Sequence, residues 1–208
     1  MKTPQPAAVA ISIGKARLEA LSDGVYAVAL TLLALDLKLA LDPGGSAGPS
    51  NAVLASALVA MVPKALVWLL SFWVASLFWL AQNRMLQQYG QLDRRGLAIE
   101  LAQLALVTLL PFSTALISTH GDRVVGALTY SVHLVMMAML SMARIRRVQR
   151  HPVLRAAAFD ALAVQAQWRR ASVWLGCLVA CAMLALVAPG WNMLAALGIL
   201  FDRPGSRR

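Results

Sequence analysis

The stretch from Arg17 to Lys38 reads RLEALSDGVYAVALTLLALDLK and decides how the rest of the chain is interpreted. It begins with ionisable and hydroxyl side chains, and from Gly24 to Leu35 it is apolar around one aliphatic hydroxyl, that of Thr31. A carboxylate such as Asp23 at the edge of a hydrocarbon span is costly, so by default it marks a functional site or a polar packing contact. The stretch therefore predicts a membrane-spanning helix with polar groups at its first turns.

The composition of the whole chain indicates a membrane protein. Of its 208 residues, 60% are hydrophobic and 13% charged, and the mean hydropathy is +0.68. A soluble domain carries about a quarter charged residues. The basic residues that give the net charge of +10 lie in short connections between apolar segments. Basic residues in such places orient a membrane protein and contact anionic lipid, so we expect no nucleic-acid partner. The first apolar span has no small-residue cleavage site after it, so we expect no secretory signal peptide.

Six apolar segments are candidates for spanning helices, which need about 20 residues each. We predict an all-α polytopic membrane protein, a single domain of residues 1–208, with spans at about 18–41, 63–82, 96–119, 124–142, 171–188 and 190–202. Before the second span, residues 51–61 form either an amphipathic lead-in or an extension of the helix. In the last span the apolar run from Trp191 to Phe201 rises only about 16 Å, roughly half a bilayer.

The bias of Lys and Arg predicts the topology. One set of connections carries most of the basic residues: Lys2, Lys15, Arg17, Arg84, Arg94, Arg95, the cluster from Arg144 to Arg170, Arg203, Arg207 and Arg208. The opposite set holds only Lys38, Lys64 and Arg123. The first set is therefore expected to be cytoplasmic, with both termini inside the inner (plasma) membrane, which requires an even number of crossings.

If the first span is one helix, Gly24, Val28, Thr31, Leu35 and Lys38 share a stripe on its surface. Several copies around an axis would give apolar rings from Val28 and Leu35, which can gate by dewetting, with a ring of hydroxyls between them. Such a stripe of small and hydroxyl side chains is equally typical of a tight seam between membrane helices. The residues alone leave both interpretations open.

The opening stretch also resembles the signature of the bacterial relatives of the lysosomal potassium channel, the transmembrane protein 175 family. That signature reads roughly Arg-x-x-x-Phe-Ser-Asp, then a helix with Ala-Ile-x-x-Thr-Leu-Leu, then an acid, Ile and Lys. Here Leu21 replaces Phe, Val28 replaces Ile and Asp36 replaces the usual Glu.

Two later segments resemble the same family. Residues 63–84 are similar to its second helix, with Gln82 and Asn83 in place of a His pair, and residues 109–114 resemble its third helix. The resemblance is good from Arg17 to Thr119 and beyond that rests on topology.

The resemblance implies a homotetramer in which the first helices line a central pore that conducts potassium and similar monovalent cations passively. Val28 and Thr31 fall on the family's hydrophobic constriction and threonine layer, and Leu35 extends this lining by helical spacing. Because the chain lacks a Thr-Val-Gly-Tyr-Gly filter, side chains of the first helix would set the selectivity, which we expect to favour potassium over sodium modestly.

Supporting roles for the pore helix fall on Arg17, Ser22 and Asp23, which match the family's Arg and Ser-Asp. Arg17 is not on the same face as Asp23, so we expect the partner of Asp23 on a neighbouring helix, where Arg84 and Asn83 lie at a compatible depth. The alternative is that Asp23 is simply a solvated acid at the interface.

Several other residues have simpler interpretations. His133, inside the fourth span, is more typical of hydrogen-bonded packing than of a proton relay, and Glu100 and Gln103 are expected near the cytoplasmic surface without a special role. Pro111 is expected to kink its helix. Cys177 and Cys181 are expected to be small packing residues.

Other functional classes find little support. The sequence contains no hydrolase triad, zinc-binding helix motif or phosphate-binding loop, so we expect no enzyme, no cofactor and no metal site. Two alternatives to a channel stay open: a secondary transporter of a small solute or proton, and a non-conducting membrane scaffold.

Overall fold

The computed structural model describes residues 14–39 and 49–189. In these ranges the chain is helical, with two short 3-10 turns. The elements are α1 (Lys15–Leu33), η1 (Ala34–Asp36), α2 (Asn51–Gln87), α3 (Arg94–His120), α4 (Val124–Arg150), η2 (Pro152–Leu154) and α5 (Ala161–Val187). Five helices in the described part are long and apolar enough to cross a membrane, so the all-α membrane class is confirmed. The expected sixth span, 190–202, lies outside the described residues.

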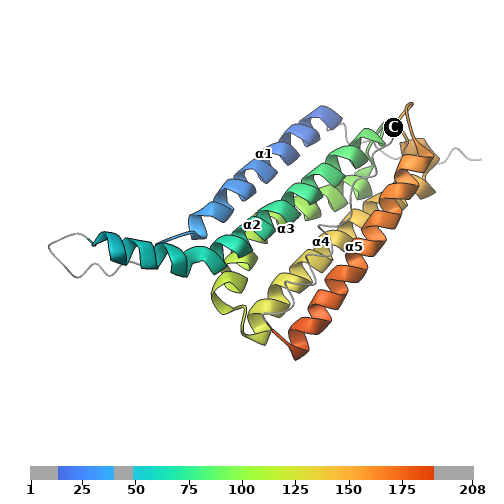
Figure 1. Ribbon diagram of the computed structural model, residues 1–208. Coiled ribbons are helices and arrows are strands. Elements are labelled where there is room, and N and C mark those ends of the chain that lie inside the picture. The colour runs from blue at the N-terminus through green and yellow to red at the C-terminus, as the bar shows by residue number, and fades with distance from the viewer. Residues whose placement is uncertain (1–13, 40–48, 190–208) are drawn as a thin grey trace, which may run out of the picture.

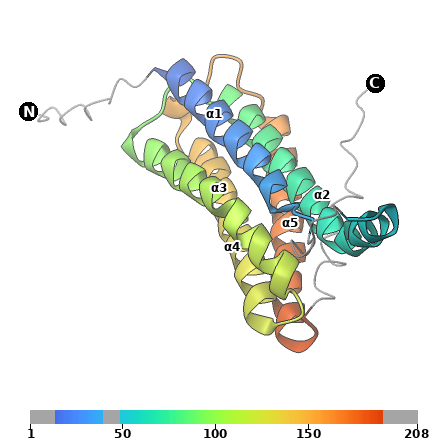
Figure 2. The same cartoon turned by 90° about the vertical axis from the view of Figure 1, so that its left-hand side faces the viewer.

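The helices form an elongated bundle, with α1 along one edge and α5 along the opposite edge (Figure 1). The closest packing is between α3 and α4 and between α4 and α5, whereas α1 packs on α2 and α3. Figure 2 shows α1 and α3 side by side on the same face. The main core draws buried side chains from all five helices, among them Tyr26, Phe78, Leu110, Met137 and Leu178. The close van der Waals packing of these side chains aligns the helices and fixes which face of each one is left open.

The first helix ends earlier than the expected span of 18–41. Its α-helical part stops at Leu33, η1 continues it to Asp36, and residues 37–39 have no regular structure. The carboxylate of Asp36 accepts a hydrogen bond of 2.7 Å from the Ser118 hydroxyl of α3. This contact ties the end of the helix to its neighbour, and Lys38 lies beyond it.

The second helix is longer than a bilayer requires. It is a single helix of 37 residues with Pro63 inside it, so residues 51–61 are an extension rather than a separate lead-in. At 1.5 Å per residue it is about 55 Å long, against roughly 30 Å of hydrocarbon. No residue from Asn51 to Leu70 is buried, and the first part of α2 turns away from the bundle (Figure 1). An internal proline, which removes a backbone donor and crowds the preceding turn, is the usual cause of such a bend.

Helices α3 and α5 have clear start signals. Asp93 caps α3 by accepting from the Gly96 amide at 3.0 Å, and Asp160 caps α5 by accepting from the amides of Leu162 and Ala163. Pro111 lies inside α3, which the structure assigns as one continuous helix. The α5 helix begins at Ala161, ten residues before the expected span.

Two connections meet at one end of the bundle. The loop between α2 and α3 is hydrogen-bonded to the loop between α4 and α5, through Gly90 to Leu154 at 2.9 Å and Ala156 to Gln88 at 2.9 Å. Both loops belong to the set rich in arginine. The sequence therefore grouped these connections correctly, while the side of the membrane that they face stays a prediction.

Candidate pore-lining face and its supporting contacts

The first helix has one packed face and one open face. Tyr26, Ala29 and Leu33 are buried against the bundle. On the opposite face Val28 is 57% exposed and Leu35 is 64% exposed. Thr31 is also exposed, between them along the chain. Within the described residues, the three residues of the predicted pore lining therefore lie on the side of α1 and η1 that no other helix covers.

The predicted stripe of five residues does not lie entirely on one α-helix. Gly24, Val28 and Thr31 are on α1, Leu35 is in the 3-10 turn, and Lys38 follows the end of the helix. A Cβ atom built on Gly24 would meet no atom within 4 Å, so this end of the face is open space. The helical stripe thus runs from Gly24 to Leu35, with a change in helical pitch before its last member.

The Thr31 hydroxyl has a defined orientation. Its Oγ1 donates a 2.8 Å hydrogen bond to the carbonyl oxygen of Val28, one turn earlier in the same helix. With its proton used in this way, the hydroxyl oxygen keeps its lone pairs as acceptors. An oxygen acceptor on an exposed helix face is a group that can replace part of the hydration shell of a cation.

A polar cluster joins α1 to α2 on the other side of the helix. The buried amide of Gln82 donates to the Ser22 hydroxyl at 2.7 Å and accepts from the Tyr26 hydroxyl at 3.2 Å. Beside it, the Trp79 indole N–H donates to the Asp23 carboxylate at 2.8 Å. We call these five residues, Ser22, Asp23, Tyr26, Trp79 and Gln82, the α1–α2 clamp.

The clamp corrects the expected partner of Asp23. The partner does lie on a neighbouring helix, but it is Trp79 rather than Arg84 or Asn83. Trp79 comes one helical turn earlier, and an indole donor satisfies a carboxylate at the edge of a span without a second charge. Sequence reasoning missed Tyr26 and Trp79, because neither carries a charge and their hydrogen bonds form only when α1 packs on α2. Arg17 is exposed and makes no ion pair within the described residues.

A buried ion pair between α3 and α4 is a second correction. Glu100 was expected near the surface without a special role, but its side chain is 1% exposed and its carboxylate lies 3.0 Å from Arg144 Nη1. The Arg144 side chain is 4% exposed and also donates to the Ser141 hydroxyl at 3.3 Å. Helical periodicity in the sequence could not identify this ion pair, because the two residues are 44 positions apart and meet only when α3 and α4 pack.

At the same end, Arg147 of α4 donates to Asp93, the cap of α3. This hydrogen bond, aided by the Gly96 amide, holds the pKa of Asp93 below its ordinary value. Further along the same helix pair, His133 meets the Ser113 hydroxyl at 2.7 Å and the Leu106 carbonyl oxygen at 2.9 Å. Both ring nitrogens of His133 are thus engaged in packing contacts between α3 and α4.

Comparison with known proteins shows what this chain is similar to. Residues 17–111 match the family described as endosomal/lysosomal potassium channel TMEM175. The chain is 35% identical over 129 residues to a potassium channel of Streptomyces collinus and 32% identical over 123 residues to one of Chamaesiphon minutus. These matches cover 59% of this chain and 59% of the first relative, and 55% of this chain and 56% of the second. The chain thus spans less than two thirds of the length of the curated relatives it matches.

A solved structure extends the likeness over most of the fold. The crystal structure of a lysosomal potassium-selective channel TMEM175 homolog from Chamaesiphon minutus superposes with a TM-score of 0.73, covering 92% of this chain and 98% of that one. At 22% identity this likeness shows the fold. This chain is therefore similar to the endosomal/lysosomal potassium channel TMEM175 family over residues 17–111, and it shares the fold of the Chamaesiphon minutus channel homolog.

Proposed function

We propose that this protein is a passive cation channel of the bacterial inner membrane, modestly selective for potassium over sodium. It works as a homotetramer of six-span chains with both termini cytoplasmic, and the first helices line the pore. The observation that carries the proposal is the open face of α1, with Val28 and Leu35 more than half exposed and Thr31 between them. The potassium channels among its relatives support the choice of ion.

One chain cannot enclose a pore with this face. The α1 helix lies along an edge of the bundle and packs on α2 and α3, so its outer face has no cover within the described residues (Figure 1). Closed cyclic symmetry is the usual way in which identical chains cover such a face. Four copies around an axis would bring four equivalent stripes together and make a ring from each exposed residue.

Each ring has a distinct task in this arrangement. The rings of Val28 and Leu35 are apolar constrictions, which close to ions when the water between them is lost. The ring of Thr31 presents hydroxyl oxygens, each oriented by its hydrogen bond to the Val28 carbonyl. Partial replacement of the hydration shell by neutral oxygens costs potassium less than sodium, since sodium holds its water more strongly. Valine is a small residue for a constriction, so the expected selectivity is modest.

The α1–α2 clamp supports the lining from behind. Ser22 and Asp23 sit at the first turns of α1 and are held by Gln82 and Trp79. Because these contacts fix the rotation and tilt of α1 on α2, they fix which residues reach the axis. We assign Arg17, exposed one turn before Ser22, to the same support through a neighbouring copy.

The test is ion flux from purified protein in liposomes, measured for potassium and for sodium. We expect a potassium-favouring flux in the wild type, a larger flux for Val28→Asn, and loss of the potassium preference for Thr31→Val. The chain offers matched controls. Val179→Asn makes the same change on the exposed surface of α5, and Thr108→Val removes a hydroxyl that makes the same 2.8 Å bond to a carbonyl three residues earlier.

The alternatives give different results in the same assay. A non-conducting scaffold shows no flux in any variant, and a secondary transporter shows flux that depends on a second, coupled ion. Equal effects of Val28→Asn and Val179→Asn would also refute the assignment of the lining, because they would show that the changes act through general destabilisation.

A further inference from the structure

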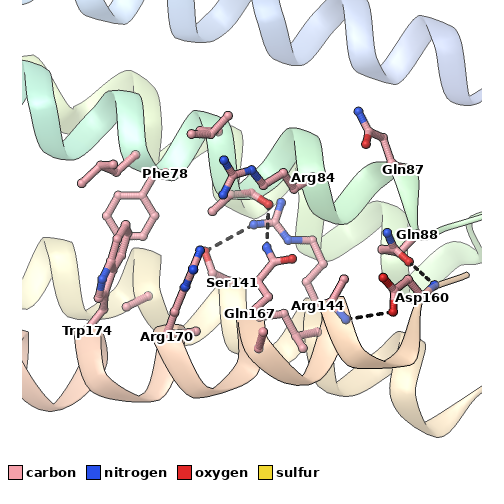
Figure 3. Close-up of a pocket in the computed structure, with 18 residues that line it drawn as sticks. Phe78, Arg84, Gln87, Gln88, Ser141, Arg144, Asp160, Gln167, Arg170 and Trp174 are labelled. Carbon is pink, nitrogen blue, oxygen red and sulfur yellow. Dashed lines mark hydrogen bonds between the residues drawn. The ribbon is translucent and has the colours of Figure 1, made fainter. Parts of the chain in front are cut away.

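A cavity of about 460 Å³ lies between α2, α4 and α5, on the side of the bundle away from α1. Its volume is within the range of sites that bind small molecules. Three arginines from three helices line it: Arg84 of α2, Arg144 of α4 and Arg170 of α5. Figure 3 shows their guanidinium groups gathered in the middle of the cavity. None of these residues belongs to the open face of α1 or to the α1–α2 clamp.

Two of the three charges are uncompensated. Arg144 is balanced by Glu100, which lies outside the cavity lining. Arg84 and Arg170 take part in no ion pair within residues 14–39 and 49–189. Among the described residues, Asp160 is the one acidic residue that lines the cavity; it lies at the far end and uses its carboxylate to cap α5 (Figure 3). The middle of the cavity therefore favours an anion.

The opposite end of the cavity is apolar. Phe78 of α2 and Trp174 of α5 meet there edge to face, with ring centroids 6.1 Å apart, and Leu77 and Leu80 extend the apolar wall. Small residues on α5, such as Ala163 and Ala171, leave the volume open. Hydrogen bonds join the walls: Gln167 donates to the Ala81 carbonyl at 2.7 Å, and Gln88 accepts from the Asp160 amide at 2.9 Å. The cavity is thus a formed site with a basic part and an apolar part.

We propose that this cavity binds an anionic phospholipid, with its phosphate between Arg84 and Arg170 and the start of an acyl chain along Phe78 and Trp174. Guanidinium groups bind phosphate oxygens in a bidentate manner, and basic pockets between membrane helices are a known setting for anionic headgroups. A lipid fits better than a free phosphate ion because the apolar end adjoins the charges, between helices that the membrane surrounds. A lipid held there would join α5 to α2, where direct contacts are few.

The test is native mass spectrometry of the full-length purified protein in detergent, titrated with phosphatidylglycerol, phosphatidylcholine or inorganic phosphate. We expect retained phosphatidylglycerol and little phosphatidylcholine. Arg84→Gln/Arg170→Gln should weaken phosphatidylglycerol binding about 30-fold, the factor that corresponds to about 1 kcal/mol for each arginine. Arg84→Lys/Arg170→Lys should bind more tightly than the Gln pair, because it keeps both charges.

The matched control is Arg95→Gln/Arg169→Gln, which removes two charges from exposed residues outside the cavity lining. An equal loss of phosphatidylglycerol binding in this control would overturn the proposal, since it would show general attraction to a basic surface. The proposal is also overturned if inorganic phosphate displaces bound phosphatidylglycerol as effectively as added phosphatidylglycerol does, because the apolar end would then contribute nothing. All variants are compared by melting temperature and oligomer size, and the readout does not depend on ion flux.

Discussion

The buried pair of Glu100 and Arg144 gives the sharpest prediction about stability. Both side chains are almost fully buried, and the carboxylate accepts from Arg144 Nη1 at 3.0 and 3.3 Å. Glu100→Leu leaves the arginine buried without its counter-ion. The expected loss is about 3–5 kcal/mol, the range measured when one partner of a buried ion pair is removed.

Removing both charges should cost much less. In Glu100→Leu/Arg144→Met no charge is left to desolvate, and the Ser141 hydroxyl keeps its hydrogen bond to the Met137 carbonyl at 3.0 Å. Tyr89 also keeps its 2.6 Å bond, which goes to the backbone carbonyl of Arg144. We therefore expect the double variant within about 1–2 kcal/mol of the wild type, in line with apolar replacements of buried pairs elsewhere.

The assay is reversible unfolding in mixed micelles, followed by tryptophan fluorescence, as a double-mutant cycle. The exposed pair of Lys15 and Glu19 is the control, with side chains 32% and 36% exposed and atoms 3.7 Å apart. Its removal should cost less than about 1 kcal/mol. The reasoning is refuted if Glu100→Leu costs no more than the control, or if the double variant is as unstable as Glu100→Leu alone.

Three further predictions concern contacts between helices. Gln82→Leu removes two of the three hydrogen bonds of the α1–α2 clamp, those to Ser22 and Tyr26, and should cost about 1–2 kcal/mol in micelles, at about 0.6 kcal/mol or more for each bond. The exposed Gln87→Leu should cost little. Asp93→Asn should destabilise the fold at neutral pH. In a pH titration, the difference in free energy of unfolding between this variant and the wild type should shrink as acid protonates Asp93 in the wild type. The sign follows from a folded-state pKa lowered mainly by Arg147: the stabilisation is present above the unfolded pKa and lost as pH falls through the folded one. Gly126→Ala should lower the melting temperature, because the new Cβ would lie 2.3 Å from the His120 carbonyl oxygen and force the tight α3–α4 connection apart.

Each of these outcomes has a clear contrary result. If Gln82→Leu leaves stability unchanged, the clamp is not a structural contact in the membrane protein. A stability difference for Asp93→Asn that grows in acid would contradict the lowered pKa. A melting temperature for Gly126→Ala at or above that of the wild type would show that the connection can relax.

The pattern of apolar runs was sufficient for the membrane class and for the approximate place of five helices in the described residues. Helix ends were less accurate, since they depend on particular contacts. The helical structure of the first span ends with η1 at Asp36, whose carboxylate accepts from Ser118, and α5 starts at Ala161 because Asp160 caps it. Periodicity also grouped Gly24, Val28, Thr31 and Leu35, because residues three and four apart share a helix face.

The sequence alone thus determined the local properties of this protein: which segments are apolar enough to span a membrane, which residues share the stripe on the first helix, and where the basic connections fall. Those properties depend on neighbours within one or two helical turns. The tertiary structure decided that this stripe is the open face of α1, that Trp79 and Gln82 hold the other side, and that Glu100 meets Arg144. It also brought Arg84 and Arg170, 86 positions apart, to one cavity. Such pairings depend on how helices distant in the chain pack together, and a single sequence carries no periodic signal for that.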